Sequence, residues 1–158
     1  MQFLYYALFV AGIVAADQVT KYLTVANIAL WEDVPFIPGL LQLTYVQNTG
    51  AAFSSFEGQQ WLFALIFAVF TVLIIRECIK NTMGFTTFEW WCIAAVYGGG
   101  LGNMIDRVRM GYVVDMIETS FMDFPVFNVA DIFITCGCIL MLLHLFLVNK
   151  DFWKEEKK

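Results

Sequence analysis

The sequence predicts an integral membrane protein that is mainly α-helical, with four transmembrane helices, a small extracytoplasmic β-sheet and a short loop or helix over a polar site. Two observations support this fold class. Of the 158 residues, 60% are hydrophobic and only 15% are charged, and the mean hydropathy is +0.71. The charges are also unevenly placed, so that long apolar segments alternate with short polar ones. We expect residues 1–158 to form a single membrane domain.

The composition also excludes several classes of function. The net charge is −5 and no basic patch is interleaved with aromatic residues, which argues against a nucleic-acid partner. Because the sequence has no CxxC pair and no Cys/His spacing typical of a metal site, we expect no metal ion and no cofactor. Cys78, Cys92, Cys136 and Cys138 are expected to be packing thiols, and His144 a helix-packing or interfacial residue.

The first transmembrane helix is predicted over about residues 2–25. Residues 3–16 carry no charge, and no Lys or Arg precedes them as in a signal peptide, so we expect a retained helix. Asp17 and Lys21 lie four residues apart, on one face of this helix. Taken alone, this spacing suggests an ion pair at the membrane interface, with the lysine snorkelling toward water.

A surface sheet is predicted within about residues 31–57, where prolines and a glycine interrupt the helical pattern. Residues 40–48, LLQLTYVQN, alternate between apolar side chains (Leu41, Leu43, Tyr45) and polar ones (Gln42, Thr44), which is typical of a strand. Because open sheet edges are not stable in the hydrocarbon core, we expect this sheet to rest on the membrane surface. Asn48 either reaches a functional site or caps a turn, and Gly50 allows a tight backbone path.

Three further helices are predicted at about 58–78, 88–107 and 128–149. The first of these begins with an uncharged apolar run that ends at Arg76. The second contains glycines at positions 98–100 and 102, which allow a neighbouring helix to approach closely. Between the second and the third, Gly111 and Pro125 indicate a non-helical connection.

The basic residues set the expected orientation. Four spans place both termini on one side, where the tail and the loop between the second and third helices carry six Lys and Arg, against three on the other side. By the positive-inside rule, the termini are therefore cytoplasmic. The polar residues then gather at the outer face of the membrane: Asp17, Lys21, Asn48, Asn103, Asp106, Arg107, Asp115, Asn128 and Asp131.

Two of these acids, Asp115 and Asp131, lie at the edges of apolar segments and could face one another across a turn. Ionisable groups next to lipid are costly and indicate a function. Two close carboxylates share a proton and can act as general acid and base in metal-free peptide hydrolysis. Alternatively, these acids cap helix ends. Asp106 and Arg107 are expected to form a structural pair at the end of the third helix.

Two other classes of membrane protein are compatible with the composition. A small transporter would need an acid near the bilayer midplane, whereas the acids here cluster at one face. A scaffold subunit would explain the apolar bulk but not the gathering of polar residues at one level. The depth of the acids would discriminate the transporter, and substitution of both acids would discriminate the scaffold.

Five blocks of the sequence resemble, in the same order, the signature blocks of the bacterial lipoprotein signal peptidase (type II signal peptidase) family. They are DQVTK (17–21), VQNTGAAFS (46–54), GGGLGNMIDR (98–107), GYVVDMI (111–117) and FPVFNVAD (124–131). The resemblance implies an inner-membrane aspartic peptidase whose active site faces outward. It also implies cleavage of diacylglyceryl-modified prolipoproteins before the lipidated Cys, inhibition by globomycin-type cyclic peptides, and a monomer.

By this resemblance, the catalytic acids are Asp115 and Asp131. One position departs from the family, because Met116 stands where the family usually has Phe. We also expect apolar flanks to cover the lipidated segment, formed by Phe53, Phe56, Val113 and Met116. Supporting or substrate-binding roles fall to Asp17, Lys21, Asn48, Gly50, Asn103, Asp106, Arg107, Asn128 and Ala130.

Overall fold

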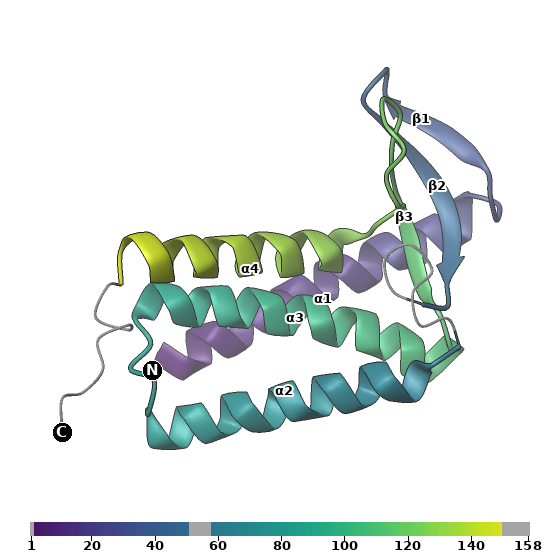
Figure 1. Cartoon of the computed structure of the whole chain (residues 1–158). Coiled ribbons are helices and arrows are strands. Elements are labelled where there is room, and N and C mark those ends of the chain that lie inside the picture. The colour runs from purple at the N-terminus through teal and green to yellow at the C-terminus, as the bar shows by residue number, and fades with distance from the viewer. Residues whose placement is uncertain (1, 51–57, 150–158) are drawn as a thin grey trace.

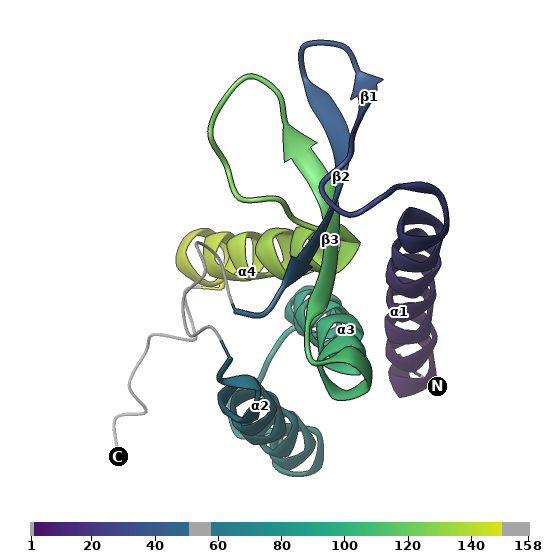
Figure 2. The ribbon, with the colours of Figure 1, turned by 90° about the vertical axis from the view of Figure 1, so that its right-hand side faces the viewer.

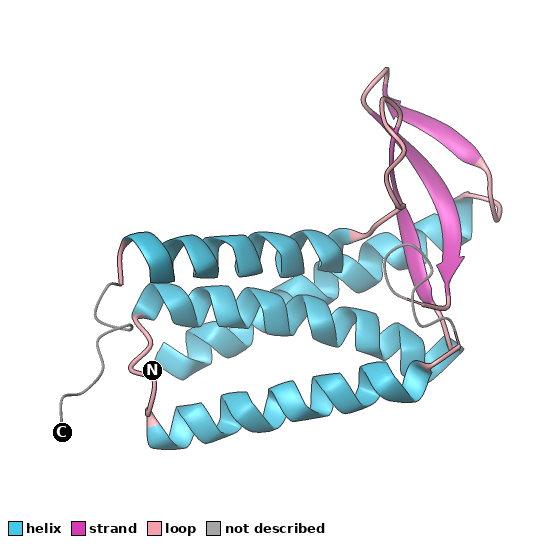
Figure 3. Ribbon diagram, viewed as in Figure 1, coloured by secondary structure: helices cyan, strands magenta, loops and turns pink. Residues whose placement is uncertain are grey.

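In the part of the chain that the structure describes, four helices form a bundle, with a small sheet at one end (Figures 1 and 3). The computed structural model describes residues 2–50 and 58–149. The fold class predicted from the sequence is confirmed, since the chain is mainly helical and carries a three-stranded antiparallel sheet. The elements are α1 (Gln2–Asn27), β1 (Asp33–Ile37), β2 (Leu41–Asn48), α2 (Gln60–Lys80), α3 (Thr87–Met110), β3 (Val113–Thr119) and α4 (Val129–Leu147).

Within the described residues, α1, α2 and α4 are long and apolar enough to cross a membrane. The helix α3 is less apolar, because it contains a glycine run and several polar residues. Figure 2 shows the reason that it tolerates them: α3 lies in the middle of the bundle, with the other three helices around it. The glycines 98, 99 and 102 and the polar residues Glu89, Asn103 and Asp106 are therefore buried inside the protein.

The sheet has the strand order β1-β2-β3, and both pairs are antiparallel. The strand predicted from the alternation within residues 40–48 is confirmed as β2. The strand β3 was not expected, because its sequence, VVDMIET, does not alternate. Its first four residues are all buried. Val114 and Met116 pack with Tyr45 on one face of the strand, whereas Val113 and Asp115 line a cavity on the opposite face. With both faces covered, a strand loses its polar–apolar alternation.

The helices α3 and α4 approach closely through glycines, as the sequence predicts. A Cβ atom on Gly99 would collide with the carbonyl oxygen of Ala130, and one on Gly137 would lie 2.8 Å from a methyl carbon of Val96. A Cβ atom on Gly102 would lie 2.5 Å from a carboxylate oxygen of Asp17, on α1. Because these glycines lack side chains, the first half of α4 and the second half of α1 can pack directly against α3.

The predicted packing role of the cysteines holds for Cys92 alone, because the other three free thiols are exposed on the helix surfaces. His144 packs between helices, since its Nδ1 lies 3.0 Å from a carboxylate oxygen of the buried Glu89 on α3. This contact is at the end of the bundle away from the sheet, near the end of α4 (Figure 1).

Candidate active site

Asp115 lies in the middle of β3 and is only 2% exposed. Both of its carboxylate oxygens accept hydrogen bonds from side-chain amides. Asn48 Nδ2 on β2 donates to Oδ2 at 2.9 Å, and Asn128 Nδ2 donates to Oδ1 at 2.6 Å. The sheet register brings Asn48 to Asp115, because β2 pairs with β3 at this point, while Asn128 reaches Asp115 from the start of α4.

Asp131 lies in the first turn of α4, where its carboxylate also accepts two hydrogen bonds. Asn103 Nδ2 on α3 donates to Oδ1 at 2.8 Å, and the backbone N–H of Asn128 donates to Oδ2 at 3.1 Å. In the opposite direction, the backbone N–H of Asp131 donates to Asn128 Oδ1 at 3.0 Å, and the two hydrogen bonds together form a capping box. Asp131 therefore caps its helix, and the same carboxylate faces the cavity described below.

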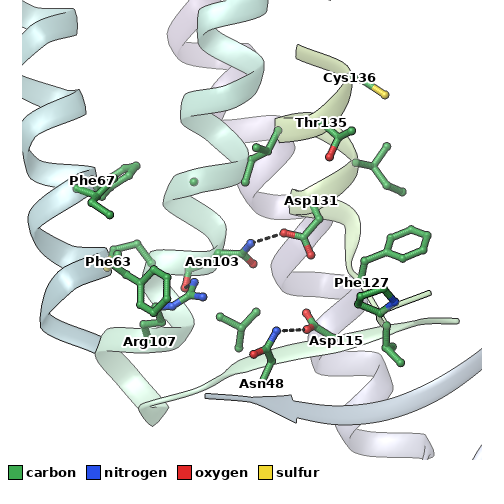
Figure 4. Close-up of a pocket in the computed structure, with 18 of the residues that line it drawn as sticks. Asn48, Phe63, Phe67, Asn103, Arg107, Asp115, Phe127, Asp131, Thr135 and Cys136 are labelled. Carbon is green, nitrogen blue, oxygen red and sulfur yellow. Dashed lines mark hydrogen bonds between the residues drawn. The ribbon is translucent and has the colours of Figure 1, made fainter. Parts of the chain in front are cut away.

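The two acids, which we call the acid pair, are linked through two asparagines. The amide of Asn128 that donates to Asp115 also donates to Asn103 Oδ1 at 3.0 Å, and Asn103 in turn donates to Asp131. Figure 4 shows both carboxyl groups directed into the space between β3 and the start of α4. The structure thus brings together, from four elements, the two acids and three asparagines that the sequence singled out.

The environment of Asp115 favours its protonated form. Burial is the largest cause and raises the pKa of this carboxyl to about 7, and the nearby charge of Asp131 also raises it. The hydrogen bonds from Asn48 and Asn128 and the charge of Lys21 oppose the shift. Asp115 is therefore a carboxylic acid that exchanges its proton near neutral pH.

A buried ammonium lies behind the acid pair, at the centre of what we call the Lys21 cluster (Asp17, Lys21 and Asp106). Lys21 Nζ is 2.9 Å from Asp17 Oδ2 and 2.9 Å from Asp106 Oδ2, and it donates to Asn103 Oδ1 at 2.8 Å. Lys21 is only 3% exposed. The predicted ion pair of Asp17 and Lys21 is therefore confirmed, but the expectation that the lysine snorkels toward water is wrong, because Lys21 is enclosed between α1 and α3.

The two carboxylates of the Lys21 cluster bind the backbone next to the acid pair. Asp17 Oδ1 accepts from the N–H of Ala130 at 3.1 Å, and Asp106 Oδ2 accepts from the N–H of Val114 at 3.2 Å. Ala130 and Val114 directly precede the two members of the acid pair. The predicted pairing of Asp106 with Arg107 is wrong, since Asp106 is bound to Lys21 on α1.

Arg107 instead extends toward β2 and α2. Its Nη2 donates to the carbonyl oxygen of Gly50 at 2.8 Å, and its guanidinium lies 4.3 Å from the centre of the Phe63 ring (Figure 4). Gly50 also donates its N–H to Asn48 Oδ1 at 2.9 Å, which orients the Asn48 amide toward Asp115. Phe63 was not predicted, because nothing in the sequence distinguishes it from the other aromatic residues of α2.

The acid pair opens onto a cavity of about 670 Å³ between α2, α3, α4 and the loop that follows β3. Its polar wall contains the acid pair with Asn48, Asn103 and Arg107; the rest is mostly apolar. Of the predicted flanks, Val113 lines this cavity, whereas Met116 is buried in the core of the sheet. Phe53 and Phe56 lie outside the described residues. The apolar lining includes Phe63, Phe67, Phe70, Phe124, Phe127 and Ile132.

Within residues 2–50 and 58–149, no three His, Cys, Asp or Glu side chains converge in a way that could hold a metal ion. The polar groups at the cavity are carboxylates, amides and one guanidinium. The chemistry these groups offer is proton transfer between carboxyl groups, assisted by amide donors.

Comparison with known proteins identifies the group to which this chain belongs. The family model described as signal peptidase (SPase) II matches residues 9–147. The chain belongs to the signal peptidase II family. A lipoprotein signal peptidase of Enterococcus faecalis (strain ATCC 700802 / V583) is 47% identical over 147 residues, covering 92% of this chain and 89% of that protein. One of Streptococcus pyogenes serotype M2 (strain MGAS10270) is 46% identical, covering 91% and 90%.

The solved structures agree with this assignment. A bacterial membrane enzyme determined by the in meso method at 2.3 Å resolution matches with a TM-score of 0.84 and 33% identity, covering 98% of this chain and 93% of that chain. A second, at 1.9 Å resolution, matches with a TM-score of 0.80, also at 33% identity, covering 91% and 94%. The chain is thus a membrane-embedded peptidase of the signal peptidase II family. This family membership decides against the transporter and the scaffold subunit.

Proposed function

We propose that this signal peptidase II is an aspartic endopeptidase that removes the signal peptide from diacylglyceryl-modified prolipoproteins, cleaving before the lipidated Cys. The names of its relatives support a lipoprotein substrate. The observation that carries the proposal is the geometry of the acid pair, in which two carboxyl groups linked through Asn103 and Asn128 face the mouth of a largely apolar cavity.

The proton is assigned to Asp115, because its pKa is raised to about 7. Asp131 accepts hydrogen bonds at both carboxylate oxygens, from the side-chain amide of Asn103 and from the backbone N–H of Asn128, so we assign it the role of general base. Asp131 then takes a proton from the attacking water, while Asp115 donates its proton to the scissile carbonyl oxygen. When the tetrahedral intermediate collapses, Asp131 protonates the leaving amine and Asp115 recovers the proton from the hydroxyl group.

The cavity suits a lipidated substrate. Aromatic and aliphatic side chains from α2, α4 and the loop after β3 give it walls that can contact acyl chains or an apolar signal peptide. Because the diacylglyceryl group anchors the substrate in the bilayer, it would present the scissile bond at the level of the acid pair and pre-orient it. Globomycin-type cyclic peptides are proposed to inhibit by occupying the same cavity.

The orientation is proposed from the count of basic residues. The start of α1 and the end of α4 lie at the end of the bundle away from the sheet (Figure 1). With these ends cytoplasmic, the acid pair and the sheet lie at the outer face of the bacterial inner membrane. The tail lysines included in the count, at 150, 154, 157 and 158, lie outside the described residues. We propose that the enzyme acts as a monomer.

The test is cleavage of a diacylglyceryl-modified lipobox peptide in detergent, with EDTA present. We expect Asp115→Asn and Asp131→Asn each to reduce kcat by roughly 10³-fold or more. A matched control is Asp123→Asn, since Asp123 is an exposed acid in the loop after β3 and does not line the cavity; it should cleave at the wild-type rate. The mechanism is wrong if both acid-pair variants retain most of their activity, and the substrate is wrong if the wild type is inert.

A further inference from the structure

Gln18 lies between the two carboxyl groups of the Lys21 cluster and takes no direct part in the proposed chemistry. Its Nε2 donates to Asp106 Oδ1 at 2.9 Å and is 3.3 Å from both Asp17 Oδ2 and the carbonyl oxygen of Gly102. Gln18 is half-buried and does not line the cavity. One amide on α1 therefore contacts both buried carboxylates and the backbone of α3.

Two carboxyl groups share one ammonium in the Lys21 cluster. Asp17 and Asp106 are 0% and 1% exposed, and Lys21 Nζ lies 2.9 Å from an oxygen of each. Buried carboxyl groups are costly unless hydrogen-bond donors satisfy their oxygens. The charged groups around Gln18 are those three, from α1 and α3, while α4 and β3 contribute backbone N–H groups to the same carboxylates.

The donors divide unequally between the oxygens of Asp106. Its Oδ2 accepts from the ammonium of Lys21 and from the N–H of Val114, whereas its Oδ1 accepts from Gln18. The amide thus fixes the rotation of the Asp106 carboxylate, and that rotation keeps Oδ2 pointed at the backbone next to Asp115. At Asp17 the same amide supplements Lys21 on Oδ2, while Oδ1 holds the N–H of Ala130.

We propose that Gln18 is a positioning residue for the acid pair: its amide fixes the orientation of the Asp106 and Asp17 carboxyl groups, and they in turn fix the backbone next to Asp115 and Asp131. The inference rests on the proposed function of the acid pair. Gln18 acts through two other side chains and does not touch the substrate cavity. Its loss should therefore lower kcat and leave KM nearly unchanged.

Two substitutions and one control test this role. In Gln18→Leu the donor is lost, and we expect kcat to fall about 10- to 100-fold. In Gln18→Glu a protonated carboxyl can still donate to Asp106, whereas an ionised one repels it. The activity of Gln18→Glu relative to wild type should therefore rise at least about fivefold as the pH falls from 8 to 5.5. The control is Thr20→Val, because the Thr20 hydroxyl donates only to carbonyls of its own helix.

The measurement is steady-state cleavage of the same lipidated peptide by purified full-length protein between pH 5.5 and 8, with the unfolding temperature recorded for each variant. A merely structural role would not make the activity ratio of Gln18→Glu depend on pH. The proposal is overturned if that ratio is constant, or if Gln18→Leu cleaves within twofold of Thr20→Val. These outcomes are distinct from failure of the proposed function, in which the wild type is inert or the acid-pair variants remain active.

Discussion

The side-chain amide of Asn128 donates to Asp115 Oδ1 at 2.6 Å, and Asn128 is also the N-cap of α4, the helix that carries Asp131. Asn128 is completely buried. Its amide nitrogen contacts Asp115 and its carbonyl oxygen accepts from the backbone of α4, so the two functions use opposite ends of one side chain. The start of α4 and the middle of β3 are thereby held in a fixed relation.

This division of labour predicts different outcomes for two substitutions of Asn128. Aspartate is as good an N-cap as asparagine but lacks the amide donor and adds a third carboxyl group. Asn128→Asp should therefore lose roughly 10²-fold or more in kcat, although its carboxylate can still accept from the N–H of Asp131. Asn128→Ala should lose activity and also about 1 kcal/mol of helix stability. The measurements are peptide cleavage and thermal unfolding; an Asn128→Ala variant that unfolds at the wild-type temperature would contradict the capping role.

The activity should depend on pH through Asp115, whose pKa is raised from its usual 3.8 to about 7. The proposed acid must be protonated, so kcat/KM should fall as the pH rises past about 7, approaching tenfold per pH unit. The check is the rate of cleavage between pH 5 and 9 at constant ionic strength. A rate that stays constant from pH 6 to 9 would show that Asp115 does not supply the proton.

The same shift affects stability with a definite sign. Between about pH 4 and 7 the folded state binds more protons at Asp115 than the unfolded state does, so the free energy of unfolding falls as the pH rises through this window. Asp115→Asn cannot titrate and removes this contribution. The decrease in Tm from pH 5 to pH 8 should therefore be smaller in Asp115→Asn than in wild type, and an unchanged decrease would contradict the raised pKa.

Much of the fold could be predicted because its signals are local. Long uncharged apolar runs indicate membrane helices, and the alternation within residues 40–48 indicates β2. The strand β3 lacked such a signal, because the core of the sheet covers Val114 and Met116 while Asp115 is enclosed at the cavity. The same burial explains why Met116 does not flank the cavity: neighbouring residues of a strand point to opposite faces.

The acids and amides of the site could be found because polar residues are conspicuous in an apolar chain. Their partners could not, since pairing is set by tertiary structure. Asp106 is adjacent in sequence to Arg107 but binds Lys21 on another helix, while Arg107 turns to the Phe63 ring on α2. Adjacent residues of a helix point in different directions, so sequence neighbours are poor candidates for ion pairs.

Removing the ammonium of the Lys21 cluster should strongly destabilise the fold. In Lys21→Met, Asp17 and Asp106 would face each other without a cation, and breaking a buried ion pair in this way typically costs about 3–5 kcal/mol. The control is Lys80→Met, since Lys80 is exposed at the end of α2. The measurement is thermal unfolding in detergent. If both variants unfold at the same temperature, the cluster does not stabilise the fold as its geometry indicates.

The close approach of α3 and α4 sets the position of Asp131 relative to Asn103. A Cβ atom on Gly99 would collide with the carbonyl oxygen of Ala130, so Gly99→Ala should push the first turn of α4 away from α3. We expect a loss of about 1–3 kcal/mol in stability, together with a loss of cleavage, because Asn103 would no longer reach Asp131. Gly12→Ala on α1 is the matched control, since nothing lies within 4 Å of its added methyl group. If Gly99→Ala cleaves the lipidated peptide as fast as Gly12→Ala, the spacing between α3 and α4 does not position the acid pair.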